Sequence, residues 1–95
     1  MSTDQLINDK YLLSENSFAQ LIVWALEEPL SGSNHFYKYR FAYVVDGVCT
    51  MRFDNEVGKG DHYHVDDREY TYKFISVDQL LTDFWVKVDE LEQSK

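Results

Sequence analysis

The chain has 95 residues, and its hydrophobic share of 44% is too high for a disordered segment and sufficient for one modest core. A formal net charge of −8 argues against nonspecific nucleic-acid binding, which depends on neutralising phosphates. The single cysteine, Cys49, excludes an internal disulfide and indicates a reducing compartment, and no apolar run is long enough to span a bilayer. We therefore expect one cytoplasmic domain over residues 1–95, without a membrane segment.

The N-terminal half predicts one strand between two irregular segments. Residues 1–9 are polar and acidic, and we expect a loosely ordered lead-in there. The run "FAQLIVWAL" at 18–26 is apolar almost throughout, which favours a strand buried on both faces. The sequence "PLSGSN" at 29–34 is typical of a loop.

The next segment predicts a β-hairpin, because Asp46-Gly47 stands between two apolar runs. A two-residue turn pairs Val45 with Val48, and strict alternation then sorts the side chains onto two faces. The expected core face carries Lys38 and Arg40 at its far end and otherwise consists of Ala42, Val44, Cys49, Met51 and Phe53. The expected exposed face carries Tyr37, Tyr39, Phe41, Tyr43, Val45, Val48, Thr50 and Arg52.

The C-terminal part predicts a loop, a short strand and a helix. Residues 54–70 contain few apolar side chains and indicate a site loop, and "YTYKFI" at 70–75 favours a short strand. Ser76 and Gln79 form a capping box, and apolar residues then recur at helical spacing through residues 76–92. The predicted fold is a small α+β domain with an antiparallel sheet and site loop over residues 10–75 and a C-terminal helix packed on one face.

The pair His62 and His64 is the first candidate for chemistry. With Glu69 it reads H-x-H-x4-E, formally the first metal-binding motif of cupins, and two histidines with a carboxylate suit zinc, iron or manganese. However, Glu56 and Ser76 stand where that motif has glycines, and no later histidine follows. We therefore expect no cofactor and no metal; a metal, if any, would use His62, His64 and Glu69. The two histidines could also simply bond to nearby acids in the loop.

The second candidate is metal-independent cleavage of RNA by acid–base catalysis, for which histidine has a suitable pKa. His62 and His64 would transfer protons, with Asp61 among the acids that orient them and His35 as a backup proton carrier. Lys59 and Arg68 would stabilise the phosphate, and the glycines beside Lys59 could turn backbone N–H groups towards it. The expected RNA-binding residues are Arg40, Arg52, Lys38 and the base-stacking tyrosines Tyr37, Tyr39 and Tyr43.

Residues 36–91 resemble the TumE family of bacterial toxins from toxin–antitoxin systems. The resemblance rests on "YKYR", on the block "RFDNEVGKGDHYH" and on the helix sequence "SVDQLLTDFW". It implies a small toxin, thought to be a ribonuclease, that is neutralised by an antitoxin with a helix-turn-helix. The family block falls on Arg52, Asp54, Asn55, Glu56, Lys59, Asp61, His62, His64 and Arg68.

The leading hypothesis is thus the toxin of a toxin–antitoxin system, acting as a metal-independent endoribonuclease. Its expected partners are an antitoxin protein and an RNA substrate, and a second copy of the chain is a possible partner. One alternative is a non-catalytic interaction module that binds through the acidic loop and the tyrosine face. The other is a metal-dependent hydrolase that uses the two histidines.

Overall fold

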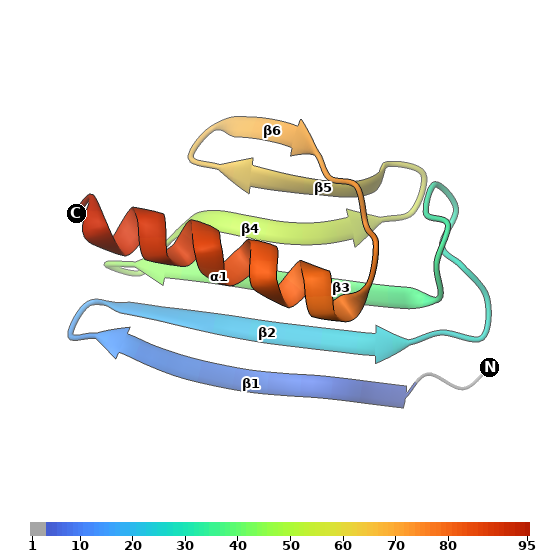
Figure 1. Ribbon diagram of the computed structural model, residues 1–95, viewed down its shortest axis with the longest axis horizontal. Helices are drawn as coiled ribbons and strands as arrows, with labels where there is room; N and C mark the ends of the chain where they lie inside the picture. Colours follow the sequence, from blue (N-terminus) through green and yellow to red (C-terminus); the bar gives the residue numbers. More distant parts are fainter. Residues whose placement is uncertain (1–3) are drawn as a thin grey trace.

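The computed structural model describes residues 4–95, which form one six-stranded antiparallel sheet and one helix (Figure 1). The strands neighbour one another in the order in which they follow along the chain, each pair joined by a turn or loop. Their bounds are β1 (Asp4–Ser14), β2 (Ser17–Ala25), β3 (Tyr37–Val45), β4 (Val48–Glu56), β5 (Gly60–Val65) and β6 (Arg68–Thr71), and the helix is α1 (Val77–Gln93). The predicted α+β fold, an antiparallel sheet with a C-terminal helix on one face, is confirmed.

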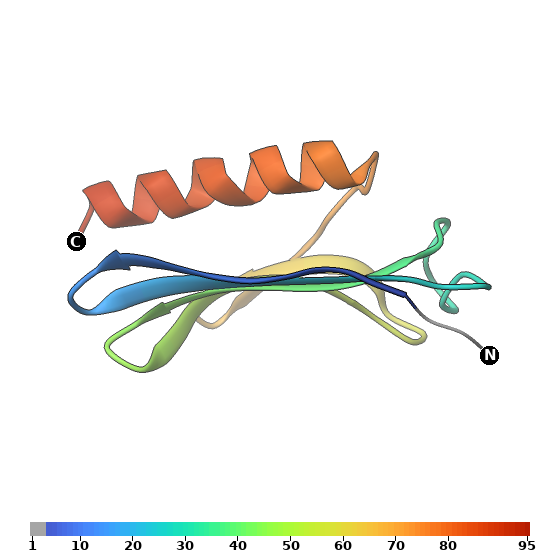
Figure 2. The same ribbon diagram turned by 90° about the horizontal axis from the view of Figure 1, so that it is seen from below.

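Helix α1 lies on one face of the sheet, and within residues 4–95 no helix or strand covers the opposite face (Figure 2). We call these the helix face and the open face. The apolar stripe of α1 buries Leu80, Phe84 and Val88, with the Phe84 ring 5.3 Å from that of Phe41. The sheet side of this core consists of Ala19, Leu21, Val23, Tyr39, Phe41, Tyr43, Met51 and Phe53.

The predicted faces of the β3–β4 hairpin are wrong for β3. The Asp46-Gly47 turn and the pairs Val45–Val48 and Val44–Cys49 are as expected, but a register shift follows, and Tyr43 pairs with Met51. One extra residue in β4 reverses the side-chain alternation relative to β3. The tyrosines therefore lie on the helix face: Tyr39 and Tyr43 are buried in the core, and Tyr37 is half-buried.

The same shift moves the cations. Because Arg40 pairs with Asp54 and Ala42 with Arg52, Lys38 and Arg40 lie on the open face and not at the end of the core, on the same face as Arg52, which was expected away from the core. Cys49, expected in the core, is exposed near the hairpin turn.

The first two strands also differ from the predictions. Residues 4–9 belong to β1, so the expected loose lead-in is wrong there, and its first three residues lie outside the described part of the chain. Strand β2 is buried on its helix face alone, since Ala19, Leu21 and Val23 are inaccessible while the alternating side chains are half-buried. Sequence composition indicated burial on both faces because large apolar residues such as Trp24 also occupy the half-covered side.

Residues 54–70 form strands and turns and not the single loop that was predicted. Strand β4 continues to Glu56, β5 returns through the histidines, and β6 ends at Thr71, earlier than expected. The turn at 57–59 packs on the loop between β2 and β3, where the Gly58 N–H donates to Ser31 O at 2.7 Å. The Lys59 N–H donates to Glu56 O, so these two N–H groups are not free to bind a phosphate.

The helix begins as its sequence predicts. Ser76 adopts extended backbone geometry, and its side chain accepts a hydrogen bond from the Gln79 N–H at 3.0 Å.

Among residues 4–95 no helix is long and apolar enough to cross a membrane.

Candidate functional site

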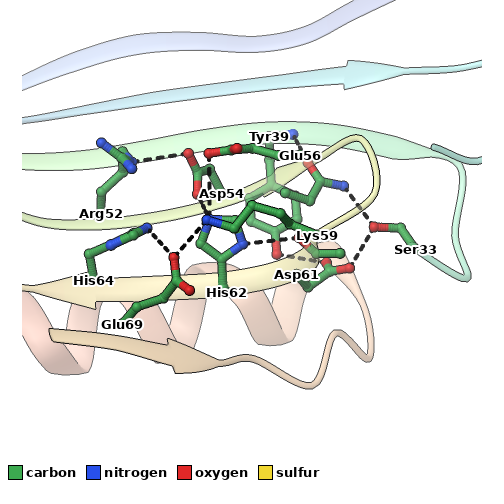
Figure 3. Close-up of polar contacts among 12 residues, drawn as sticks. Ser33, Tyr39, Arg52, Asp54, Glu56, Lys59, Asp61, His62, His64 and Glu69 are labelled. Atoms are coloured by element: carbon green, nitrogen blue, oxygen red, sulfur yellow. Dashed lines mark hydrogen bonds and ion pairs between the residues drawn. The ribbon is translucent and has the colours of Figure 1, made fainter. Parts of the chain in front are cut away.

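The candidate site lies on the open face, where β4 and β5 pair. His62 is opposite Asp54 and His64 is opposite Arg52, so residues distant by about ten positions become cross-strand neighbours. The period of two along β5 places both imidazoles on the same face, as the sequence analysis expected for an extended segment. Figure 3 shows these four side chains pointing towards one another. We call Arg52, Asp54, His62 and His64 the open-face site.

The Asp54 carboxylate joins these side chains. Its Oδ1 atom lies 2.8 Å from His62 Nε2, and its Oδ2 atom lies 3.0 Å from Arg52 Nε. Asp54 and His62 have side-chain exposures of only 7% and 5%, whereas that of His64 is 26%. The other ring nitrogen of His62, Nδ1, lies 3.1 Å from the carbonyl oxygen of Gly60. The site is thus a buried carboxylate–histidine pair with a more accessible histidine at its edge.

Four buried atoms of this site have no hydrogen bond of normal geometry within residues 4–95. They are Arg52 Nε, Asp54 Oδ1, His62 Nε2 and His64 Nε2. The charged pairs are therefore close in distance, but their atoms are not aligned as donors and acceptors. Buried polar atoms are nearly always paired, so a group of unpaired atoms that converge on one place is unusual and marks a position where a ligand could bind.

Longer charged side chains form the rim of the site. Glu69 Oε1 lies 2.9 Å from Lys59 Nζ and 3.4 Å from His64 Nε2. The hydrogen bond from Lys59 lowers the pKa of Glu69, and the same bond raises the pKa of Lys59. Lys59 is therefore bound to Glu69 at the rim. Lys38, on the same face, donates to the backbone carbonyl of Asn55, and burial lowers the pKa of its ammonium group.

A second polar cluster lies behind the site, on the helix face. Asp61 accepts hydrogen bonds from Ser33 Oγ, Tyr39 OH and His35 Nε2, each at 2.7 Å. The Tyr37 N–H donates to the remaining nitrogen of His35 at 3.3 Å. Burial, followed by the hydrogen bond to Asp61, strongly raises the pKa of Tyr39. We call Ser33, His35, Tyr39 and Asp61 the Asp61 network.

The structure divides the sequence-predicted site residues between the two faces. His62, His64, Arg52, Arg40 and Lys38 lie together on the open face, with Lys59 at the rim. Asp61 and Arg68 lie on the helix face, because each is one residue out of phase with the histidines or with Glu69. The same applies to Tyr37, Tyr39 and Tyr43, so the predicted exposed tyrosine surface is wrong. Both nitrogens of His35 are engaged, which leaves no free position for a backup proton carrier.

Asp54 is the site residue whose position the sequence analysis missed. The sequence places it among the acids of the predicted loop over residues 54–70, whereas in the structure it is buried opposite His62. The signal was available in "EVGKG" at 56–60, whose two glycines permit a tight turn and thus a second hairpin. A hairpin there places Asp54 and His62 on one face.

The residues able to hold a metal also differ from those predicted. Ligand atoms of Asp54, His62 and His64 lie within 4.8 Å of one another, and this is the group of that kind found within residues 4–95. Glu69, the predicted third ligand, lies at the rim, close to His64 and bound by Lys59.

The open sheet face and its buried polar centre belong to a small α+β protein, and comparison with protein families gives the class of this protein, a toxin. The chain matches the family model described as Toxin TumE over residues 3–92 and belongs to that family. Searches of curated proteins and of solved structures found no match. The resemblance stated from residues 36–91 is confirmed and extends through β1 and β2.

Proposed function

We propose that this toxin is an endoribonuclease and that the open-face site is its reaction centre. The observation that supports the proposal is the convergence of Arg52, Asp54, His62 and His64 at adjacent paired positions of two strands. A histidine–carboxylate pair beside guanidinium groups combines a group able to transfer protons with cations able to neutralise a phosphate.

The site would need to supply only proton transfer and charge stabilisation, because the RNA itself supplies the nucleophile. The 2′-hydroxyl loses its proton as its oxygen bonds to phosphorus, and the bond from phosphorus to the 5′-oxygen breaks. That 5′-oxygen then takes up a proton, leaving a 2′,3′-cyclic phosphate and a 5′-hydroxyl. The protein must move these protons and neutralise the charge that develops on the phosphoryl oxygens.

The cations of the open face could neutralise the charge that develops on the phosphoryl oxygens. Arg52 contacts the Asp54 carboxylate, and Arg40 is the cross-strand neighbour of Asp54 on β3. Lys38 precedes Arg40 on the same face. An acidic protein with a net charge of −8 thus presents a local set of cations where the substrate would bind.

The geometry changes the roles proposed for the two histidines. Acid–base catalysis by both rings, without a metal, requires that each ring offers a nitrogen to the RNA. His62 is almost fully buried, and its nitrogens face Gly60 O and Asp54 Oδ1. A metal-independent reaction would therefore depend on His64 for contact with the substrate.

The test is cleavage of a labelled RNA by the purified full chain and by the H62A/H64A double variant. We expect at least a ~1000-fold loss of cleavage, in line with the usual contribution of general acids and bases, and loss of growth inhibition. The cleaved ends of the wild-type reaction should be 2′,3′-cyclic phosphates.

The third histidine provides the matched control. The single variant H35Q changes a histidine of the Asp61 network and should cleave RNA normally in its folded fraction, measured by circular dichroism. A folded double variant that still inhibits growth at the wild-type level would refute the proposal.

We also propose that a helix-turn-helix antitoxin neutralises this toxin. Membership of a toxin family and the sequence resemblance support this partner. A small helix-turn-helix gene beside this one, whose product copurifies with the chain, would be the expected finding.

A further inference from the structure

The three residues that could bind a metal ion carry three of the four unpaired buried atoms of the open-face site. These atoms are Asp54 Oδ1, His62 Nε2 and His64 Nε2. The fourth, Arg52 Nε, is an N–H group and cannot be a ligand; it lies against the other oxygen of the Asp54 carboxylate. We propose that Asp54, His62 and His64 bind one divalent transition-metal ion.

The hydrogen bonding of His62 supports this assignment. Gly60 O can only accept, so His62 Nδ1 carries the ring proton in the 3.1 Å contact between them. In a neutral ring this leaves a lone pair on Nε2, the atom that faces Asp54 Oδ1. Histidines that bind metals commonly donate their other N–H to a backbone carbonyl, which fixes the tautomer and the ring orientation.

The spacing and the donor set suit such an ion. Histidine and carboxylate ligands lie about 2.1 Å from zinc, and at tetrahedral angles two such ligand atoms are roughly 3.4 Å apart. Ligand atoms of the three residues lie within 4.8 Å of one another, and His62 Nε2 lies 2.8 Å from Asp54 Oδ1, so small side-chain movements would bring them to that spacing. Two imidazoles and one carboxylate favour Zn²⁺, Mn²⁺ or Fe²⁺ over Mg²⁺ and Ca²⁺, which prefer oxygen ligands. A bound anion is disfavoured, because one of the three atoms is a carboxylate oxygen.

The burial of the three side chains matches a catalytic rather than a closed site. Asp54 and His62 are buried, whereas His64 is partly exposed towards the open face. Three protein ligands leave a coordination position for water or substrate. When bound, the ion would polarise a phosphoryl oxygen and lower the pKa of its bound water. This catalytic part rests on the proposed function; the binding itself does not.

The experiment is a titration of the untagged full chain with Co²⁺, followed by its visible absorption bands, with Zn²⁺ as competitor. We expect one equivalent to bind, and at least ~100-fold weaker binding in D54N, H62Q and H64Q, because losing a ligand costs more than losing a supporting contact. The matched control is E69Q, which removes the third ligand of the sequence-based alternative. It should retain one equivalent.

Two results would overturn the assignment of these three ligands. One is failure of the folded wild-type chain to bind Co²⁺ or Zn²⁺, and the other is loss of binding in E69Q together with its retention in D54N. Where a variant does not fold, the wild-type chain supplies the readout: Zn²⁺ should raise its melting temperature and EDTA should reverse this, and no shift would overturn the proposal.

The same samples distinguish the metal site from the proposed ribonuclease. RNA cleavage that continues in excess EDTA, by protein shown to be metal-free, would overturn a role for the ion in the reaction and leave the ribonuclease intact. Stoichiometric metal binding without RNA cleavage would instead support the site and overturn the proposed function.

Discussion

Two histidine–carboxylate pairs lie on opposite faces of strand β5. Their nitrogen–oxygen distances are similar, but their hydrogen bonding differs. On the helix face His35 Nε2 lies 2.7 Å from Asp61 Oδ2, and on the open face His62 Nε2 lies 2.8 Å from Asp54 Oδ1. Asp61 accepts three side-chain hydrogen bonds, whereas Asp54 Oδ1 has none of normal geometry within residues 4–95.

This difference in hydrogen bonding indicates the role of the Asp61 network and of the open-face site. A fully bonded buried network fixes the position of its parts and stabilises the fold. The Asp61 network does so by holding the loop between β2 and β3, which supplies Ser33 and His35, against the sheet. An incompletely bonded buried cluster costs free energy and is retained where a ligand or a reaction uses it. The open-face site fits the second description.

The largest expected effect comes from moving the loop that carries the Asp61 network. Gly60 has a φ of +76°, and a Cβ there would lie 2.5 Å from the Gly32 carbonyl oxygen. Gly60→Ala combines left-handed strain with a backbone clash and should destabilise the fold by about 4 kcal/mol. Urea unfolding measures this.

Gly58 is the matched control for that substitution. Its φ of +81° is similar, but a Cβ there would have no neighbour within 4 Å. Gly58→Ala should therefore cost only about 1 kcal/mol, from conformational strain alone. Equal losses in the two variants would show that the approach of Gly32 and Gly60 does not hold the loop.

The next prediction compares the two aspartates directly. Asp61→Asn places an NH₂ group among three donors, so at least one hydrogen bond to a buried charged group is lost, and we expect destabilisation of about 3 kcal/mol. Asp54→Asn removes the carboxylate 3.0 Å from Arg52 Nε, but Arg52 is 29% exposed to water and that contact is not aligned as a hydrogen bond, so we expect a smaller loss of stability, about 1 kcal/mol.

Stability and toxicity should then separate. Thermal or urea unfolding of both variants, with growth inhibition measured in parallel, tests this. Asp54→Asn should abolish growth inhibition while remaining folded. A toxic Asp54→Asn variant, or one as unstable as Asp61→Asn, would contradict the contrast between the faces.

The sequence predicted those parts of the fold that depend on local patterns. The Asp46-Gly47 turn, the capped helix and the position of both histidines on one face all follow from turn chemistry, capping and periodicity. The faces of β3 could not be obtained in this way, because one extra residue in β4 reverses the alternation, and nothing in "VCTMRF" indicates that bulge.

For the same reason, the sequence predicted only part of the candidate site. The histidines were found by their type and spacing, but their partner Asp54 depends on a cross-strand register. Asp61 stands beside His62 in the sequence and was grouped with it, yet neighbouring residues of a strand point to opposite faces. Loop contacts such as that between Gly32 and Gly60 join distant segments and have no local signature.

The smallest expected effect concerns a hydrogen bond between sheet and helix, which the Tyr43 hydroxyl donates to Glu92 of α1. This hydrogen bond lowers the pKa of Glu92 below its ordinary value. Its stabilising contribution is therefore complete above the unfolded pKa, about 4.3, and is lost as the pH falls through the lower folded pKa. Since the Glu92 side chain is 24% exposed, Tyr43→Phe should cost only about 1 kcal/mol at pH 7. The difference from the wild-type chain should shrink as urea unfolding is repeated at successively lower pH, starting from about pH 5, above the unfolded pKa. Glu92→Gln, which keeps an acceptor that does not titrate, should lose this pH dependence; parallel curves for wild type and Tyr43→Phe would show that the pair does not link helix and sheet.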